Sequence, residues 1–352
     1  MPLTDDPALL GRPELADALE PPLEALAGRV ILITGAAGSL GQALARTLAR
    51  SPRARLVLLD HHEHSLFSLQ RTLAAEGEHG RQRFVLADVR DTRRLTQVVR
   101  GERPDIVFHF AAYKHVHYGE QFPEQSVAVN VLATRELLGL AAATGVERFV
   151  YPSSDKAVDP PSLYGATKRI AEVLVMAAAA RGHAYTALRY VNVLGTLGSV
   201  LETFAAQLAA GRPLTVTDRG MARYWMSQRE AIWLALHAAQ APAGSLLMLD
   251  GLVEVPLLET AARVAELHRL GPEYPIMVTG ARPGERLREQ LLGPHERAVP
   301  GPRAGLVRVE DALRAQHVAR VEEMVDELAM LCDEAAEAQL RAAAMRAAHA
   351  LQ

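Results

Sequence analysis

The sequence contains almost no cysteine and carries almost no net charge. Cys332 is the single cysteine among 352 residues, which excludes an internal disulfide framework and fits a reducing compartment. Its helical, Leu- and Ala-rich context predicts a packed side chain rather than a reactive thiol. The formal net charge of -3 lacks the basic excess that is typical of nucleic-acid-binding proteins. We therefore expect no nucleic-acid partner.

Long hydrophobic runs are also absent from the sequence. No apolar stretch reaches the roughly 18 residues that a membrane-spanning helix needs. Residues 1–27 are acidic and contain proline, unlike a signal peptide, and we expect a leader with helical pieces at 13–18 and 22–26. The dense histidine cluster at 61–64 follows a predicted strand in a loop, where we expect no metal. The sequence thus predicts a soluble cytoplasmic protein without a membrane span.

A glycine-rich turn follows the first predicted strand. Residues 29–34 form a continuous β-branched run, as in a strand buried on both faces, and residues 42–50 have a helical pattern. Glycines between such elements let the backbone turn tightly and approach a pyrophosphate at the helix N-terminus. The sequence therefore predicts a dinucleotide site built by Gly35, Gly38, Ser39, Leu40 and Gly41.

Asp60 ends the second predicted strand, about 20 residues beyond the glycine turn. A carboxylate at this place accepts hydrogen bonds from the adenosine ribose and repels a 2′-phosphate. We therefore expect NAD as the cofactor rather than NADP. A helix N-cap is the alternative role for Asp60, and His61, His62 or Arg71 would be available to a phosphate.

Further cofactor contacts are expected where the third and fourth strands end. Asp88 and Val89 follow strand 83–87 and are placed to edge the adenine ring. Ala111 and Ala112 follow strand 106–110, and their small side chains let the backbone pass close to the cofactor. The segment then continues into the cleft through Tyr113 and Lys114.

Strands and helices alternate through the first half of the chain. Predicted strands lie at 29–34, 55–59, 83–87, 106–110, 148–151 and 185–190. This alternation predicts an α/β fold with a Rossmann-type doubly wound parallel sheet. We expect the NAD-binding domain at 28–190 with later segments returning to it, a smaller mixed α/β substrate lobe at 191–308, and a helical tail at 309–352.

Tyr164 and Lys168 stand four residues apart on a predicted helix that follows strand 148–151. This spacing puts both side chains on one face, where an ammonium favours the phenolate of its neighbour. Alone, such a pair is more often a rim aromatic and a solvated charge. Its position after the glycine turn, with Asp155 and Lys156 just upstream, favours a site with two acid/base pairs.

The second half of the chain mixes short elements and carries basic residues in loops. Arg223 and Arg282 are placed to clamp a diphosphate, with surface solvation as the alternative for each. The Ala-, Glu-, Arg- and Leu-rich region from Val309 onward predicts a packing or oligomer helix.

These residues resemble the extended short-chain dehydrogenase/reductase family. Within it, they are similar to the bacterial UDP-N-acetylglucosamine 4,6-dehydratases of the CapD-like polysaccharide-biosynthesis group, of which we expect a soluble member. The similar segments are 34–41, 59–61, 111–116, 153–168, 189–200, 215–218 with Arg223, and 282–285.

The resemblance implies a reaction and a role for each catalytic residue. Tyr164, with its pKa lowered by Lys168, would take the proton of the sugar 4-hydroxyl, and Ser154 would hydrogen-bond to that oxygen. A neutral Lys156 would remove the C5 proton, and a protonated Asp155 would protonate the departing C6 hydroxyl. Contacts to the UDP-sugar substrate are implied for Lys114, Asn192, Ser199, Val200, Arg223, Arg282 and Glu285.

Two other functions remain open at this stage. A nucleotide-sugar 4-epimerase would use Tyr164 and Lys168 without needing the couple Asp155–Lys156. A catalytically silent nucleotide-binding regulator would be expected to lose one of these side chains, and all are present. His117 and Tyr118 depart from the family pattern near the expected sugar pocket. We also expect a homo-oligomer.

Overall fold

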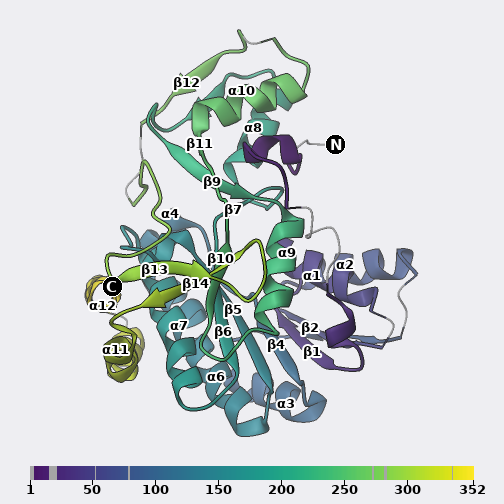
Figure 1. The fold of residues 1–352 in the computed structure, drawn as a ribbon, viewed down its shortest axis with the longest axis vertical. Coiled ribbons are helices and arrows are strands. Elements are labelled where there is room, and N and C mark those ends of the chain that lie inside the picture. Colours follow the sequence, from purple (N-terminus) through teal and green to yellow (C-terminus); the bar gives the residue numbers. More distant parts are fainter. Residues whose placement is uncertain are drawn as a thin grey trace.

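A large twisted sheet forms the base of the molecule, and a smaller lobe lies above it (Figure 1). The computed structural model describes residues 4–15, 22–51, 53–77, 80–271, 273–280, 284–334 and 336–352. Within these residues, nine strands form the large sheet in the order β13-β14-β10-β6-β5-β4-β1-β2-β3. The pairs from β3 to β10 are parallel, whereas β14 runs antiparallel to β10 and β13. The expected doubly wound α/β fold is confirmed.

Six strands of the large sheet lie within three residues of the expected ranges, whereas β10, β13 and β14 were not expected from the sequence. The strands are β1 (Val30–Thr34), β2 (Arg55–Asp60), β3 (Gln82–Leu86), β4 (Ile106–His109), β5 (Arg148–Ser154), β6 (Tyr185–Tyr190), β10 (Leu246–Leu249), β13 (Glu296–Pro300) and β14 (Leu306–Asp311). Because β1, β4, β5 and β6 are adjacent and parallel, their carboxyl ends meet at one edge.

Helices cover both faces of the large sheet, and each layer has its own apolar core. One core joins α1 (Ser39–Ala49), α2 (Glu63–Ala75) and α9 (Gln228–Ala238) to the sheet. The other core involves α3 (Thr92–Glu102), α5 (Pro123–Val127), the π-helical η4 (Ala128–Leu132), α6 (Ala133–Thr144) and α7 (Leu163–Ala180). The short α4 (Val116–Gln121) packs against α5 and α7.

The smaller lobe has a third apolar core. Its described residues form a sheet of β7 (Asn192–Val193), β9 (Ala222–Met226) and β11 (Glu254–Pro256), and a pair of β8 (Leu214–Val216) with β12 (Ile276–Val278). Helices α8 (Val200–Ala209) and α10 (Leu257–Leu267) cover these strands, together with η1 (Pro7–Leu10). Buried Leu9 and Leu10 thus bring part of the expected leader into this core.

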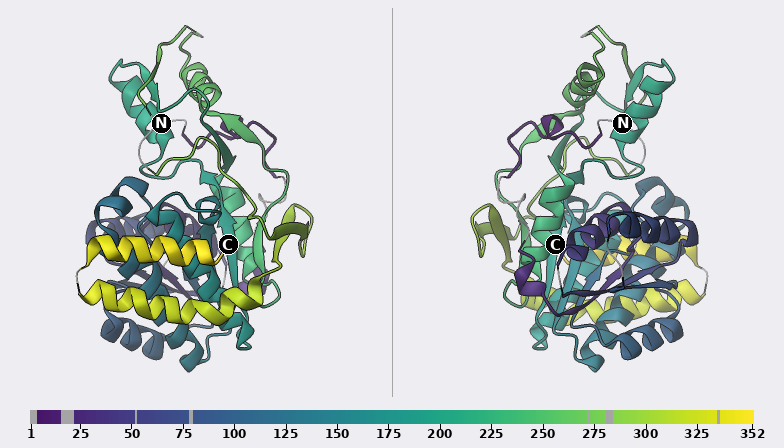
Figure 2. Two further views of the ribbon diagram at one scale, coloured as in Figure 1. Left: turned by 90° about the vertical axis from the view of Figure 1, so that its left-hand side faces the viewer. Right: turned by 90° about the vertical axis from the view of Figure 1, so that its right-hand side faces the viewer.

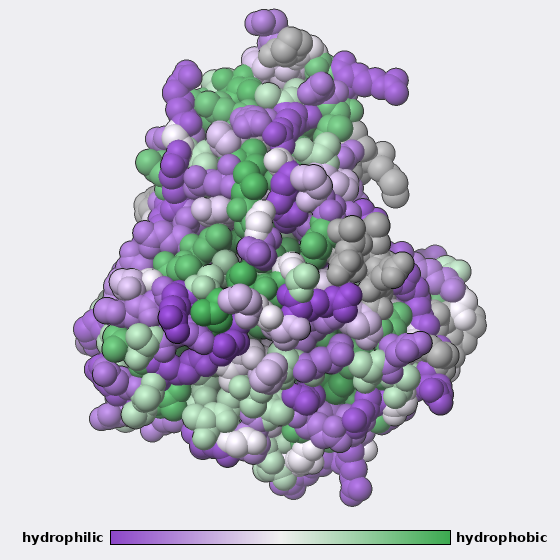
Figure 3. All heavy atoms as spheres, viewed as in Figure 1, coloured by the Kyte–Doolittle hydropathy of each residue, from purple (hydrophilic) through white to green (hydrophobic). Residues whose placement is uncertain are grey.

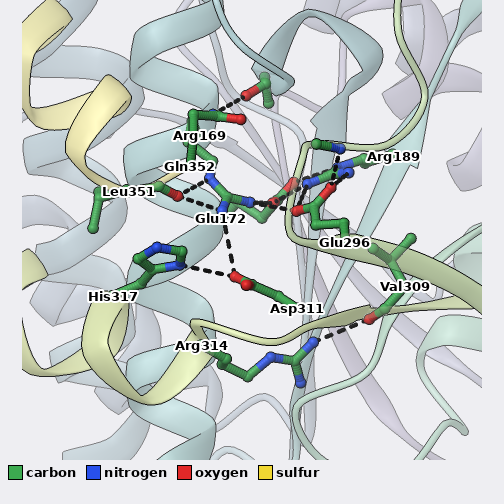
Figure 4. Close-up of polar contacts among 12 residues, drawn as sticks. Arg169, Glu172, Arg189, Glu296, Val309, Asp311, Arg314, His317, Leu351 and Gln352 are labelled. Carbon is green, nitrogen blue, oxygen red and sulfur yellow. Dashed lines mark hydrogen bonds and ion pairs between the residues drawn. The ribbon is translucent and has the colours of Figure 1, made fainter.

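Two long helices, α11 (Arg314–Asp333) and α12 (Glu337–Ala350), lie side by side and pack on α7 (Figure 2). A buried network of charged side chains joins this region to the sheet (Figure 4). Arg169 of α7 pairs with Glu172 at 2.7 Å and with Glu296 at 2.9 Å. Arg189 of β6 pairs with the same two carboxylates, at 2.8 Å and 2.6 Å. Arg169 Nε also donates to the carbonyl oxygen of Leu351 at 2.7 Å.

One helical stretch, Pro123–Thr144, is long and apolar enough to cross a membrane by length and composition alone. Half of its most apolar window is buried inside the protein, where α5, η4 and α6 contribute to the core on one face of the sheet. The face shown in Figure 3 mixes hydrophilic and apolar side chains, and apolar groups gather towards the middle of the view. A packed core helix therefore accounts for this stretch.

The structure differs from the sequence expectations at both ends of the chain. Residues 13–15 are not helical, residues 16–18 lie outside the described part, and η3 (Glu24–Leu26) is a single 3₁₀ turn. The region after Val309 does not begin as helix, because β14 continues to Asp311 between β10 and β13. Pairing with distant strands overrides the local helical pattern there.

Candidate active site

The glycine turn lies at the carboxyl edge of the sheet, between β1 and α1. Gly35 has a φ of +67°, and a Cβ on it would lie 2.6 Å from the backbone nitrogen of Ala111. A Cβ on Gly41 would lie 2.1 Å from the carbonyl oxygen of Gly35. These contacts exclude any larger residue. Gly38 precedes α1 without a side-chain cap, so the first amides of this helix are available to an anion.

Asp60 holds this turn from the end of β2. Its carboxylate accepts hydrogen bonds from the backbone N–H of Ala37 and of His62, each at 2.9 Å. The cap of α2 is His62, whose side chain accepts from the N–H of Ser65, so Asp60 is not the N-cap. A carboxylate has enough lone pairs to accept further bonds from ribose hydroxyls. The preference for NAD over NADP stays a prediction.

The other expected cofactor contacts follow β3 and β4 directly: Asp88, Val89, Ala111, Ala112 and Tyr113. A hydrogen bond from Arg90 lowers the pKa of Asp88. The backbone N–H of Tyr113 donates to Asn130 Oδ1 at 2.8 Å, and Asn130 Nδ2 donates back to the carbonyl of Tyr113 at 2.9 Å. Asn130 is buried on η4, so it fixes the backbone that leaves β4, a role that its sequence position did not reveal.

Tyr164 and Lys168 lie one turn apart near the start of α7. Burial lowers the pKa of Lys168 to about 7, and its Nζ lies 4.2 Å from the centroid of the Tyr151 ring. Burial raises the pKa of Tyr164, and the charge of Lys156 and a hydrogen bond with Ser154 oppose this rise. We expected Lys168 to be the cation that lowers the pKa of Tyr164. In the structure, Lys156 has the larger effect.

Asp155 and Lys156 follow β5 in the turn η5 (Asp155–Ala157). Lys156 Nζ lies 3.1 Å from Asp155 Oδ1 and 3.3 Å from Glu289 Oε1. Burial lowers the pKa of Lys156, but these two carboxylates outweigh it and the pKa is raised. The expectation of a neutral Lys156 is therefore wrong for this structure, because the second carboxylate comes from a distant segment.

Ser154 and Asp155 are also coupled directly. Ser154 Oγ donates to Asp155 Oδ1 at 2.9 Å and accepts from the backbone N–H of Lys156 at 3.3 Å. The second carboxylate oxygen, Asp155 Oδ2, is buried and has no hydrogen-bond partner among the described residues. A buried polar atom of this kind normally finds a partner, so Asp155 Oδ2 is available to a further hydrogen-bond donor.

The expected substrate residues fall into two groups. Asn192 and Arg223 lie beside Asp155 and Lys156, with Asn192 Oδ1 3.5 Å from Lys156 Nζ and Arg223 Nε 3.9 Å from Glu289. The second group lies near α8, where Ser199 is the N-cap and Val200 the first helical residue. Lys114 Nζ donates to the carbonyl of Leu197 in the same loop.

Glu285 and Arg282 are the remaining expected substrate residues. Glu285 is partly buried in the segment that returns from the small lobe to the large sheet. Arg282 lies outside the described residues.

Lysine usage is a signal that the motif search missed. The chain has 38 basic residues, but only three of them are lysine: Lys114, Lys156 and Lys168. All three belong to the expected site, and every other cation is arginine. The pKa of a lysine is lowered far more easily than that of an arginine, which stays charged in proteins. Lysine scarcity alone could have marked these positions, whereas nothing local marks Glu289.

A parallel sheet with a glycine turn after its first strand, and a Tyr-x-x-x-Lys pair at the same edge, define a short-chain dehydrogenase/reductase of the extended type. The chain belongs to the family described as "Polysaccharide biosynthesis protein", whose profile matches residues 31–309. The family assignment from the sequence is confirmed.

Three curated relatives illustrate the range of similar proteins. The "Probable polysaccharide biosynthesis protein EpsC" of Bacillus subtilis (strain 168) is 37% identical over 76% of this chain and 46% of the relative. The "UDP-N-acetylglucosamine 4,6-dehydratase (inverting)" of Campylobacter jejuni (strain 81-176) is 28% identical over 75% and 78%. The "UDP-glucose 4-epimerase" of Rickettsia typhi is 29% identical over 80% and 82%. The chain thus spans about half the length of EpsC.

Solved structures show the same fold. Pen from Bacillus thuringiensis superimposes with a TM-score of 0.75 at 27% identity, covering 82% of this chain and 89% of Pen. A double mutant of DesIV, a dTDP-glucose 4,6-dehydratase from Streptomyces venezuelae with NAD and DAU bound, gives a TM-score of 0.64 at 25% identity. That match covers 75% of this chain and 88% of DesIV. Similar proteins thus include both dehydratases and epimerases of nucleotide sugars.

Proposed function

We propose that this chain is an NAD-dependent 4,6-dehydratase acting on UDP-N-acetylglucosamine or a related UDP-amino sugar. The observation that carries the proposal is the couple of Asp155 and Lys156, 3.1 Å apart, at the sheet edge where Tyr164 also lies. Chemistry at C4 alone needs one proton carrier beside the cofactor. Elimination across C5 and C6 needs two more, and this couple supplies them. The dehydratase of Campylobacter jejuni supports the same substrate class.

The residues present fit a dinucleotide. The glycine turn and the uncapped start of α1 suit a pyrophosphate, and the carboxylate of Asp60 suits the adenosine ribose. Asp88, Val89, Ala111, Ala112 and Tyr113 would line the adenine and the path to the nicotinamide, beside Tyr164 and Lys168. When bound, NAD+ supplies reversible hydride exchange with the sugar, first at C4 and finally at C6.

Tyr164 would accept the proton of the 4-hydroxyl. Its raised pKa opposes ionisation, so the phenolate depends on neighbours that stabilise it. Lys168 has a pKa of about 7 and can give or take a proton at neutral pH. Ser154 would hold the 4-oxygen beside Tyr164. Asn192 and Arg223 would hold the sugar nucleotide beside this group.

Asp155 and Lys156 would carry out the elimination. A ketone at C4 acidifies the C5 proton. Lys156 would accept that proton after passing the one that it holds at rest to Asp155, 3.1 Å away. Asp155 would protonate the departing C6 hydroxyl, which leaves as water, and its unpartnered Oδ2 is the oxygen available for that contact. Lys156 would then return its proton to C5, and the 4-hydroxyl proton held by Tyr164 replaces the one that Lys156 passed to Asp155. The sum of these steps is the loss of one water.

Mass spectrometry of the product tests the proposal. Incubation with UDP-N-acetylglucosamine and NAD+ should yield a sugar nucleotide lighter by one water. An isomer of unchanged mass would instead show a 4-epimerase, the alternative that the similarity to the Rickettsia typhi epimerase supports. Tight nucleotide binding without turnover would show a silent binding protein.

Replacing Lys156 by Ala should abolish dehydration while NAD binding, followed by calorimetry, stays within about twofold of wild type. The amine is expected to touch the sugar and not the dinucleotide. Unchanged turnover would contradict the role given to Lys156.

A further inference from the structure

Glu289 contacts Lys156, although it belongs to none of the motifs identified in the sequence. It lies in the segment that crosses from β12 in the small lobe to β13 in the large sheet. This segment is anchored to the small lobe and to the turn that follows β5. The carbonyl of Leu287 accepts from the backbone N–H of Ala222 in β9 at 2.8 Å, and Arg286 contacts Asp159 in the turn after Lys156.

The Glu289 carboxylate is withdrawn from water and faces two cations. Its side chain is 4% exposed, and Oε1 lies 3.3 Å from Lys156 Nζ and 3.9 Å from Arg223 Nε. A buried carboxylate without a cation would be strongly disfavoured, so the contact with Lys156 is part of how this segment folds. The carboxylate of Glu289 is therefore held next to Lys156.

The ammonium of Lys156 is held from three separate elements. Asp155 Oδ1 contacts it from η5 at 3.1 Å, Asn192 Oδ1 from β7 at 3.5 Å, and Glu289 from the crossing segment. The other charged or titratable groups that act on Lys156 are Arg223 and Tyr164. Among the described residues, two carboxylates contact Lys156. Asp155 is its neighbour in the sequence, whereas Glu289 comes from a distant segment.

We propose that Glu289 is a positioning residue for the elimination step, which orients the amine of Lys156 and controls how readily it releases its proton. The consequence for turnover rests on the proposed function, whereas the effect on the amine does not. A carboxylate 3.3 Å away favours the charged form of a lysine. Removing that charge should therefore lower the pKa of Lys156 and make the free base available at lower pH.

Nuclear magnetic resonance can follow this amine directly, because the chain has only three lysines. Protein labelled with carbon-13 at lysine Cε should give three signals, and the signal missing from Lys156→Met identifies Lys156. In Glu289→Gln the titration midpoint of Lys156 should fall by roughly one pKa unit or more. Glu289→Asp keeps the charge on a shorter arm and should lower the midpoint less. If Glu289→Gln folds poorly, the Lys156 midpoint in Glu289→Asp still tests the proposal.

Glu254→Gln is the matched control. Glu254 lies on β11 and pairs with the exposed Arg288 at 3.6 Å, so its loss should leave the Lys156 midpoint unchanged. An unchanged Lys156 midpoint in folded Glu289→Gln would overturn the proposal, whether or not the protein dehydrates a sugar.

If the wild type is a dehydratase, the acidic limb of its pH–kcat profile should move to lower pH in Glu289→Gln. Glu289→Asp should restore it towards the wild-type position. A purely structural role would lower kcat at every pH without moving the limb, and that result would also overturn the proposal. Absence of dehydration in the wild type would refute the proposed function while the titration still decides the role of Glu289.

Discussion

At the scale of single residues, Lys156 and Lys168 belong to one site but have opposite pKa shifts. Lys168 lies against the ring of Tyr151, and burial dominates its pKa. Lys156 lies between Asp155 and Glu289, and their charges outweigh burial. The structure thus separates a lysine that exchanges protons near neutrality from one that rests as a cation. The difference in pKa between the two lysines therefore comes from the groups that surround each of them.

The lowered pKa of Lys168 predicts a pH-dependent stability. Its pKa falls from 10.5 to about 7 on folding, so between these values the unfolded chain holds a proton that the folded protein has lost. Stability from this group therefore rises with pH across that window. In urea unfolding, the stability of the wild type relative to Lys168→Met should rise between about pH 7 and 10.5, since methionine has no proton to lose. Parallel stability curves would contradict the assignment.

At the scale of elements, α7 packs so closely on the turn η5 that a single methyl group on Gly165 matters. A Cβ on Gly165 would lie 2.1 Å from the carbonyl oxygen of Lys156. Gly165→Ala should therefore push the turn away from α7, lower kcat at least tenfold, and destabilise the fold by about 1–3 kcal/mol. Steady-state kinetics and chemical unfolding measure the two effects.

Gly139 provides the matched control on the neighbouring helix. It is exposed on α6, and a Cβ there would meet no atom within 4 Å. Gly139→Ala should leave turnover unchanged and stabilise the protein by roughly 0.5–1 kcal/mol, because alanine favours helix. Equal effects of both substitutions would show that the contact at Gly165 is unimportant.

The elements themselves were largely predictable, and so was part of the site. The apolar runs at β1 and β2 and the glycine turn have strong local patterns, and Tyr164, Lys168, Asp155 and Lys156 follow from motif spacing. Glu289 was not predictable, because an irregular segment brings it across the cleft. The protonation of Lys156 was mispredicted for the same reason. Local sequence identifies a catalytic group, but distant partners set its charge.

At the scale of the whole molecule, the buried network around Arg169 and Arg189 joins α7, β6 and β13 and reaches α12 (Figure 4). Burial would raise the pKa of Glu296, but hydrogen bonds and charge from Arg189 hold it at about 2. The stabilisation is therefore present above the ordinary glutamate pKa and is lost as pH falls towards 2.

Glu296→Gln should destabilise the protein by about 3–5 kcal/mol, because it leaves two buried guanidinium groups with one carboxylate fewer. Glu310 is the control, since it pairs with Arg297 and Arg308 at the protein surface. Glu310→Gln should cost much less, because exposed ion pairs contribute little to stability. Equilibrium unfolding in guanidinium chloride measures the stability of both variants. A similar loss of stability in the two would mean that the buried network contributes no more than a surface ion pair.

The restriction of lysine to Lys114, Lys156 and Lys168 has a practical consequence. Reagents that acylate amines normally modify a protein all over its surface. Here, apart from any α-amino group, their targets are the three lysines of the proposed site. Such reagents should therefore modify the proposed site selectively, and a bound sugar nucleotide should protect these lysines from modification.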